Sequence, residues 1–228
     1  MIERRFIDLG AVRPGITPLT RADDAHFSAV LCLARDQSFH WNSDVRVDLF
    51  VLEGAVRDKA GRRPAAGDFL SRCESGSLVV DDAPALLFAY RERRMHDCRN
   101  IDLPVGAREW LASPVRSMET ATLSDIGHRV SLVRWHPGAH VRPHAHGDGE
   151  ELLVLEGELR NGDEAYPRGT WLRLHAQDTH APFAEVPALT LLRTGHLGAP
   201  PQRTRERQMA GIATGVETIE QDNYIQKH

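Results

Sequence analysis

Residues 138–157 read GAHVRPHAHGDGEELLVLEG, and they decide both the fold and the chemistry that we expect of this chain. His144 and His146 stand two residues apart, a spacing at which the side chains of a β-strand point to the same face. Glu150 keeps that parity if strand pairing continues across the Gly-Asp-Gly turn, whereas a one-residue step turns Glu151 outward. The stretch therefore predicts three polar side chains that converge on one side of a strand.

A fourth candidate ligand, His180, comes from a later strand. Three neutral imidazoles and one carboxylate suit Zn, Fe, Mn, Ni or Cu far better than Ca or Mg, so the predicted metal ligands are His144, His146, Glu150 and His180. Held on one side of a barrel cavity, these ligands leave one or two positions open for water, dioxygen or a bidentate ligand.

The remaining histidines, out of 12 in the chain, need no common explanation. We expect His136, His140 and His175 in loops or at the rim of the site, where His140 or His175 could donate a hydrogen bond to a ligand residue. His196 follows a predicted strand, and the sequence indicates no role for it.

An internal repeat runs through the chain. Residues 49–58 read LFVLEGAVRD and residues 152–161 read LLVLEGELRN, an offset of 103 residues. The same offset pairs Pro64 with Pro167 and one Pro-Ala-Leu run with another. Three matches at one offset indicate a tandem duplication of a unit of about one hundred residues, the size of a small domain.

Each repeat unit consists of short β-rich runs separated by Gly, Pro and Asp. In the second unit the predicted strands are 131–135, 151–159, 170–174 and 189–194. Short strands at this spacing, without amphipathic helices between them, indicate an all-β chain of sandwich or barrel units. The expected domains are an N-terminal unit over 1–104, a C-terminal unit over 105–200 and a tail over 201–228, which could be a packed arm or a dimer contact.

Only the second unit carries the candidate ligands. The offset of 103 places their counterparts in the first unit at Trp41, Ser43, Val47 and Ser77, none of which is a usual metal ligand. His40 lies one residue from the first position, which turns its side chain to the opposite face. We therefore expect a metal-free first unit whose cavity is partly filled by Trp41 and Val47, and which serves as a packing or dimerisation partner or holds an apolar ligand.

The pattern Gly138-x5-His144-x-His146-x3-Glu150-x6-Gly157, followed by Pro167-x-Gly169 and His180, resembles the two conserved motifs of the cupin superfamily. More particularly, the stretch from Val130 to Leu197 is similar to the cupin domain of ChrR-type anti-sigma factors and their stand-alone bicupin relatives. The resemblance implies two tandem cupin barrels of the jelly-roll type. It also implies one divalent metal on His144, His146, Glu150 and His180, with zinc as the first expectation and iron, manganese or nickel as alternatives.

The resemblance leaves two classes of function open. The first is an enzyme, a metal-dependent oxygenase or hydrolase that acts on a small oxygenated molecule such as a diketone, with Glu150 detaching to serve as a base. The second is a non-catalytic sensor, in which a metal or an oxidant alters the cupin and a protein partner detects the change. The chain has no histidine followed by a CxxC pair, the mark of the helical zinc domain with which the family grips a sigma factor. A purely structural zinc site is less favoured, because closed structural sites prefer Cys ligands.

The composition limits partners and location. A net charge of -4 argues against nucleic acid as a partner. No window approaches the roughly 18 apolar residues of a membrane helix, which argues against a membrane protein. Cys32, Cys73 and Cys98 are odd in number and widely spaced, so we expect reduced thiols and a cytoplasmic location. We further expect a homodimer that takes a small molecule as substrate or ligand.

Overall fold

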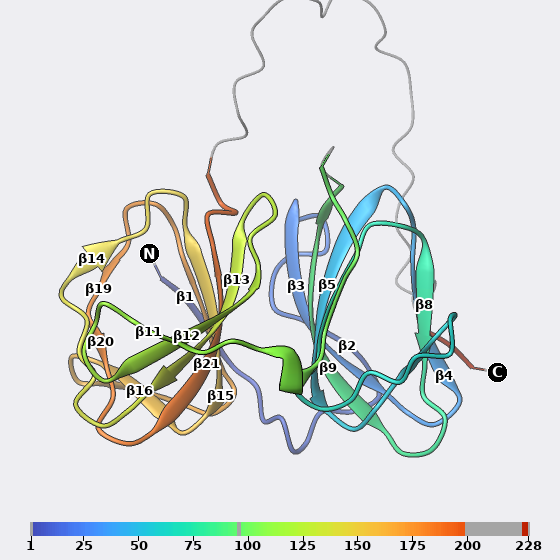
Figure 1. Ribbon diagram of the computed structural model, residues 1–228, viewed down its shortest axis with the longest axis horizontal. Coiled ribbons are helices and arrows are strands. Elements are labelled where there is room, and N and C mark those ends of the chain that lie inside the picture. Colours follow the sequence, from blue (N-terminus) through green and yellow to red (C-terminus); the bar gives the residue numbers. More distant parts are fainter. Residues whose placement is uncertain (1, 95–96, 199–224, 228) are drawn as a thin grey trace, which may run out of the picture.

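The computed structural model describes residues 2–94, 97–198 and 225–227, and it places them in two β-barrels that lie side by side (Figure 1). The predicted fold class, an all-β chain of two tandem barrels, is confirmed. Within these ranges, helix is confined to the three-residue 3-10 helix η1 (Val105–Ala107) in the connection between the barrels. The described chain accordingly has no helix that is long and apolar enough to span a membrane.

The first barrel consists of a six-stranded sheet, with the order β10-β7-β5-β9-β3-β2, and a four-stranded sheet, with the order β22-β4-β8-β6. The strands are β2 Gly15–Pro18, β3 His26–Leu33, β4 Gln37–Trp41, β5 Val45–Glu53, β6 Arg57–Asp58, β7 Phe69–Arg72, β8 Gly76–Val79, β9 Ala85–Arg93, β10 Ile101–Leu103 and β22 Ile225–Lys227. Apolar side chains from both sheets, among them Leu49 and Leu78, pack together and fill the barrel.

The second barrel consists of a seven-stranded sheet, with the order β1-β18-β15-β21-β13-β12-β11, and two smaller sheets, β17-β16-β20 and β14-β19. The strands are β1 Glu3–Phe6, β11 Leu111–Ala112, β12 Met118–Ser124, β13 Arg129–Trp135, β14 His144–Ala145, β15 Glu150–Glu156, β16 Glu158–Asn161, β17 Glu164–Pro167, β18 Thr170–Leu174, β19 Thr179–His180, β20 Pro182–Phe183 and β21 Ala188–Thr194. The four strands predicted in this unit are present, and only 151–159 is divided, at Gly157, into β15 and β16.

The internal repeat has a direct structural cause at this division. Gly157 has a φ of +69°, and a Cβ atom placed on it would lie 1.9 Å from the carbonyl oxygen of Pro187. Its counterpart Gly54 has a φ of +75°, and a Cβ atom there would lie 2.6 Å from the carbonyl oxygen of Pro84. The Leu-Glu-Gly and Pro-Ala-Leu runs that recur at the offset of 103 therefore touch each other in both barrels, where only glycine permits the close approach.

Two strands depart from the predicted domain boundaries. β1 lies within the predicted N-terminal unit 1–104 but pairs with β18 of the second barrel. β22, at the end of the predicted tail 201–228, pairs with β4 of the first barrel, while the rest of the tail lies outside the described residues. Strand pairing uses backbone hydrogen bonds, so an open sheet edge can take a strand from any part of the chain.

β15 is buried on both faces, which explains its almost continuous run of apolar residues. Leu152 and Val154 point into the second barrel and belong to its interior core. Leu153 and Leu155 point the other way and pack in a separate cluster that includes Phe88 of the first barrel. The two barrels therefore share a hydrophobic core between their large sheets, and the first barrel acts as a packing partner of the second.

The expectation of reduced thiols is wrong for two of the three cysteines. Cys73 and Cys98 form a disulfide, with Cα atoms 5.9 Å apart, whereas Cys32 is buried and free. The reason is the pairing of β10 with β7, which brings the chain after β9 back alongside Cys73, whose backbone amide donates to Asn100 Oδ1 (2.9 Å). The two cysteines are 25 residues apart in the sequence, so their spacing gave no indication of this contact. Because two of the cysteines are bonded, the cysteines no longer support a cytoplasmic location, which remains a prediction.

Candidate metal centre

Three small elements carry the predicted ligands. His144 lies on β14 and His180 on β19, and these two residues are direct cross-strand partners. His146 follows β14, and the chain then turns at Gly149, whose amide donates to the carbonyl oxygen of His146 (3.0 Å). Glu150 is the first residue of β15, at the end of the large sheet. The turn thus places the carboxylate of one sheet beside the histidines of another.

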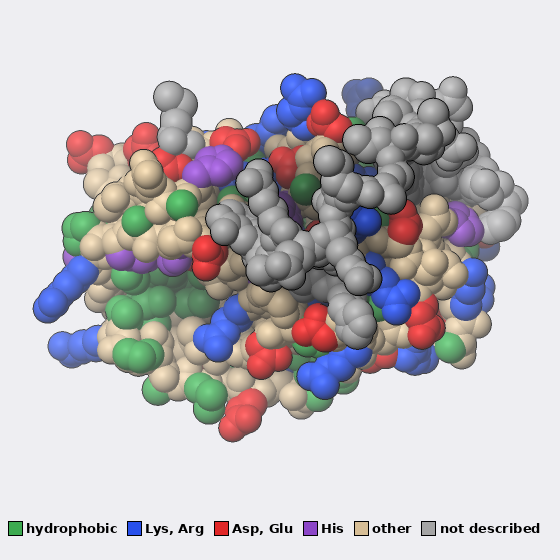
Figure 2. Space-filling model, turned by 90° about the horizontal axis from the view of Figure 1, so that it is seen from above, with side chains coloured by type: hydrophobic (Ala, Val, Ile, Leu, Met, Phe, Trp, Pro, Cys, Tyr) green, Lys and Arg blue, Asp and Glu red, His purple; other side chains and the backbone are tan. Residues whose placement is uncertain are grey.

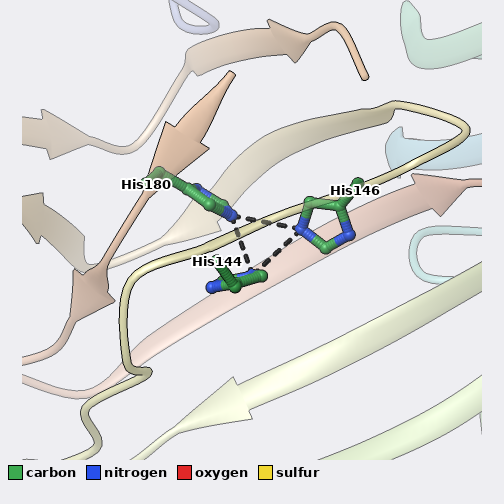
Figure 3. Close-up of side chains that lie close together, drawn as sticks. All are labelled: His144, His146 and His180. Atoms are coloured by element: carbon green, nitrogen blue, oxygen red, sulfur yellow. Dashed lines mark hydrogen bonds between the residues drawn. The ribbon is translucent and has the colours of Figure 1, made fainter. Parts of the chain in front are cut away.

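The three imidazoles meet at their Nε2 atoms (Figure 3). The Nε2 atom of His144 lies 3.0 Å from that of His146 and 3.0 Å from that of His180, and the third distance, His146 to His180, is 3.2 Å. The carboxylate of Glu150 approaches the same point, with Oε2 3.2 Å from His146 Nε2 and Oε1 3.8 Å from His180 Nε2. The structure therefore brings the three predicted histidines into one cluster, and Glu150 lies beside two of them, His146 and His180.

The hydrogen bond of His144 to the backbone orients its imidazole toward the other two histidines. Its Nδ1 lies 2.8 Å from the carbonyl oxygen of Arg142, an acceptor that requires the proton on Nδ1. Its Nε2 then presents a lone pair toward the other two imidazoles. Lone pairs that converge within 3.2 Å repel one another unless a proton or a metal ion lies among them.

Burial prepares these groups to bind a metal. Burial lowers the pKa of His180 to about 3 and also lowers the pKa of His146, so both imidazoles are neutral at pH 7. The carboxyl of Glu150 is 3% exposed, and burial raises its pKa to about 8. A buried carboxyl beside three imidazoles gains most from a positive ion that would let it ionise.

The dimensions of the cluster fit a single transition metal. Metal–imidazole bonds of about 2.0–2.1 Å, at angles between 90° and the tetrahedral value, put the ligand nitrogens about 2.9–3.4 Å apart. The observed separations of 3.0 to 3.2 Å fall within this interval. Imidazole nitrogen together with carboxylate oxygen is a donor set for Zn, Fe, Mn, Ni or Cu.

The sequence of the second barrel matches a known family. Residues 101–198 match the family described as the ChrR Cupin-like domain. The second barrel is a cupin domain. The resemblance to ChrR-type cupins is thereby confirmed for this part of the chain, while no curated protein sequence matches it significantly.

Solved structures extend the likeness to both barrels. A candidate dioxygenase from Nostoc punctiforme has a TM-score of 0.67 at 16% identity and covers 88% of this chain and 88% of its own. YlbA from E. coli has a TM-score of 0.65 at 11% identity, with 84% of this chain and 90% of its own covered. Oxalate decarboxylase from Lactobacillus farciminis, in a formate complex, has a TM-score of 0.61 at 11% identity, with 85% of this chain and 86% of its own covered. At these identities the likeness shows a shared cupin fold.

The first barrel has apolar side chains, Trp41 and Val47, at two of the positions that correspond to the ligands of the second. Trp41 and Val47 are buried in its core, and the indole of Trp41 lies over Gly76, where a Cβ atom would be 2.4 Å from the ring. His40 pairs with Ser77 but points away from this core, with Nε2 2.7 Å from Ser38 Oγ. The described part of the first barrel therefore has no metal ligands at the positions that correspond to the centre.

The other histidines of the cupin domain lie outside the cluster. His140 and His175 are exposed, and His175 Nε2 lies 2.9 Å from Glu3 Oε1 of β1. His136 is exposed beside Glu119 (3.4 Å). The hydrogen bond that orients His144 comes from a backbone carbonyl, so neither His140 nor His175 performs that role.

Glu151 occupies a position that the sequence did not indicate. It faces away from the histidines as predicted, but this side of β15 lies against the first barrel, and Glu151 is fully buried. Its carboxylate accepts hydrogen bonds from Ser28 Oγ (2.5 Å) and Arg173 Nε (2.6 Å), and His196 Nε2 lies 3.3 Å away. A glutamate within an apolar strand was the only sign of this contact in the sequence.

A second group of buried charges continues the contact between the barrels. Arg193 of the cupin domain donates to Glu92 of the first barrel (2.5 Å), and His128 lies between Glu92 (3.3 Å) and Asp48 (3.5 Å). Arg46 also donates to Asp48 (2.9 Å). Burial opposes ionisation of Asp48, but the hydrogen bond to His128 and the charge of Arg46 hold its pKa at about 2. These ion pairs fix the first barrel against the sheet that carries Glu150.

Proposed function

We propose that the chain is a metal-dependent enzyme of the dioxygenase type, whose substrate is a small molecule with two neighbouring oxygen donors. The observation that supports this most is the convergence of three Nε2 atoms, with the buried carboxylate of Glu150 beside two of them. The fold likeness to a candidate dioxygenase and to an oxalate decarboxylase agrees with such a substrate class.

The exposure of the cluster supports an exchangeable site over a closed structural one. Glu150 and His180 are 3% and 6% exposed, whereas 24% of the His146 side chain is accessible and His144 is half-buried. Figure 2 shows one face of the molecule, with histidine side chains in purple on the half that the cupin domain forms and also on the other half. A site with two buried and two partly exposed ligands leaves a side open for a small molecule.

Glu150 is the proposed general base. Burial raises its pKa to about 8 in the metal-free chain, so a Glu150 carboxylate that detaches from the metal would accept a proton more readily than an exposed glutamate does. His146 lies against one of its oxygens (3.2 Å) and His180 against the other (3.8 Å), so the carboxylate is oriented from two sides. A substrate C–H or O–H group above the histidines would pass its proton to Glu150, away from bulk water.

The metal would be held by His144, His146, His180 and Glu150, and when bound it supplies Lewis acidity and an anchor for dioxygen. Zinc is the first candidate, from the ChrR resemblance, and iron, manganese and nickel share the same donor preference. Oxygen chemistry requires a redox-active metal, so the enzyme proposal favours iron or manganese among them. The chain would contribute three neutral imidazoles and the carboxyl of Glu150, which releases its proton when the metal binds.

The metal proposal is tested by elemental analysis of the purified chain. We expect about one transition-metal ion per chain, lost in His144→Ala and His146→Ala. His140→Ala is the matched control, because this exposed histidine lies outside the cluster. Absence of a bound metal after reconstitution, or equal loss in the control, would reject the site.

The enzyme proposal is tested separately by oxygen uptake. The Fe(II)-loaded and Mn(II)-loaded chain is offered β-diketones and catechols, and Glu150→Gln, loaded at a metal concentration that offsets its weaker metal binding, should turn over slowly. Turnover by the wild-type protein that depends on His146 supports the proposal. A metal-loaded protein without turnover on any of these substrates would contradict it.

A second candidate is favoured by the match to the ChrR Cupin-like family over residues 101–198. In this alternative the metal site is a sensor, and a metal or an oxidant changes the surface that a protein partner contacts. If the chain is a sensor, the metal-loaded protein should consume no oxygen in the uptake assay. Metal binding should instead change hydrogen exchange at β14 and β19. Three expectations remain predictions: a cytoplasmic location, a homodimer, and no nucleic acid among the partners. Light scattering of the purified chain would test the dimer.

A further inference from the structure

A pocket of about 340 Å³ lies at the junction of the two barrels, away from the histidine cluster. It is lined by the connection after η1 and by β13, β15 and β21. Glu156 of β15 and Leu189 of β21 line it, and these two residues pair at the end of the sheet opposite to Glu150 and Thr194. Six residues of extended strand separate Glu150 from Glu156, roughly 20 Å.

The floor of this pocket is apolar. Leu132 is fully buried, and Ala188 and Trp135 are 6% and 5% exposed. Trp110 forms one wall, and its ring is covered by the guanidinium of Arg134 at 3.6 Å from the ring centroid. A volume of this size is at the lower end of the range for small-molecule sites, roughly 300–1,000 Å³.

Arg108 brings an incompletely partnered cation to the rim of this apolar floor. Its Nε and Nη2 atoms are shielded from solvent, and neither has a hydrogen-bond partner among the described residues. Its guanidinium lies over the ring of Phe50 at 5.4 Å. The carboxylate of Asp68 interacts with Arg108 through its charge, but its oxygens accept the backbone amides of Val105 and Ala65 (both 2.9 Å). A shielded guanidinium without hydrogen bonds is costly, and an anion would satisfy it.

Two arginines, Arg108 and Arg134, line the pocket together with one carboxylate, that of Glu156. Arg134 and His136 both lie against Glu119, at 3.5 and 3.4 Å, so one carboxylate serves two basic groups. Glu156 is exposed and is the acidic residue of the lining. Burial lowers the pKa of Arg108 and the charge of Asp68 opposes this shift, as expected for a guanidinium short of partners.

We propose that this pocket binds a small organic carboxylate, with the carboxylate on Arg108 and the apolar body against Trp110 and Leu132. A planar carboxylate matches the fork of a guanidinium, and an aromatic or aliphatic body suits the floor. The pocket shares no residue with the histidine cluster, so this ligand is distinct from a substrate at the metal.

The test is a titration of the full, metal-free chain with benzoate, followed by calorimetry and by tryptophan fluorescence. Two of the four tryptophans, Trp110 and Trp135, line the pocket, so binding should change the emission. We expect saturable binding of benzoate and none of benzamide, its neutral analogue. Arg108→Gln should weaken binding by at least about tenfold, the loss of one charge-assisted hydrogen bond.

Controls separate the pocket from general charge effects. Arg116→Gln removes an exposed arginine outside the lining and should leave the benzoate affinity unchanged. Arg108→Lys keeps the charge without the fork and should give an intermediate affinity, which also serves if the glutamine variant is unstable. Equal binding by wild type and Arg108→Gln, binding of inorganic phosphate in preference to benzoate, or no binding of millimolar benzoate would overturn the proposal. The benzoate titration is then repeated with the metal-loaded chain. Because the pocket shares no residue with the histidine cluster, the benzoate affinity should be the same with and without metal, whether or not the proposed enzyme activity exists.

Discussion

Glu150 and Glu151 are neighbours in the sequence with opposite environments, and a pair of glutamine substitutions should separate their roles. Glu150 lies at the histidine cluster, whereas Glu151 lies in the contact between the barrels. Glu151→Gln should destabilise the fold and leave metal binding intact. Glu150→Gln should weaken metal binding and leave the metal-free fold intact.

The expected cost of Glu151→Gln follows from its surroundings. The side chains of Arg173 and Glu151 are 3% and 0% exposed. Removing one partner of a buried ion pair costs about 3–5 kcal/mol, because the other charge stays buried without compensation. Arg173 keeps Asp24 as a second partner at 2.6 Å, so we expect the lower end of this range. For a chain of this length about 3 kcal/mol corresponds to a decrease in Tm of about 6–12 °C.

Glu150→Gln is the matched control. Burial raises the pKa of Glu150 to about 8, so in the metal-free chain at pH 7 this carboxyl is protonated and neutral. Glutamine has nearly the same shape and the same charge as the protonated acid. In the absence of metal, the Tm of the Glu150→Gln variant should therefore stay within about 2 °C of that of the wild type. The affinity of the variant for Zn²⁺ should fall at least about tenfold.

The assay is differential scanning calorimetry of the metal-free proteins, together with a calorimetric titration with Zn²⁺. A decrease in Tm of less than about 2 °C for Glu151→Gln would refute the energetic role of the buried pair. Equal loss of stability in both variants would refute the assignment of the two side chains to opposite faces of β15.

Three further outcomes follow from the fold. The pKa of Asp48 in the folded chain, about 2, lies below the ordinary value of 3.8. Ionised Asp48 therefore stabilises the fold above pH 4, and this stabilisation is lost as the pH falls toward 2. In urea unfolding, the difference in the free energy of unfolding between wild type and Asp48→Asn should shrink by about 2 kcal/mol over that window. Gly157→Ala should lower Tm several times more than Gly162→Ala, since both glycines have positive φ but only Gly157 faces a carbonyl oxygen at 1.9 Å; similar shifts in a thermal scan would contradict the close approach. Reduction of the Cys73–Cys98 disulfide, which closes a loop of 25 residues, should cost about 3 kcal/mol, measurable as a lower Tm in dithiothreitol that a Cys73→Ser variant no longer shows.

The histidine cluster could be predicted because the geometric rules behind it are local. The alternation of side chains along a strand puts His144 and His146 on one face, and the short turn before Glu150 preserves that parity. His180 was predicted from the cupin motif and not from strand spacing. The structure gives the physical reason for its place in the motif, because His180 on β19 is the cross-strand partner of His144 on β14. The duplication was visible for a similarly local cause, since Gly54 and Gly157 each need the same contact within one barrel.

What lies on the far side of each strand depended on the packing of distant segments. The sequence could place Glu151 opposite to the histidines, but only the docking of the first barrel turned that outer face into a buried one, with Ser28 and Arg173 as partners. The Cys73–Cys98 disulfide and the pocket around Arg108 have the same origin, because each joins segments that meet only after strands pair or barrels pack. Periodicity in a sequence determines which side chains share a face, whereas the neighbours of that face are chosen by long-range pairing and burial, which no local pattern encodes.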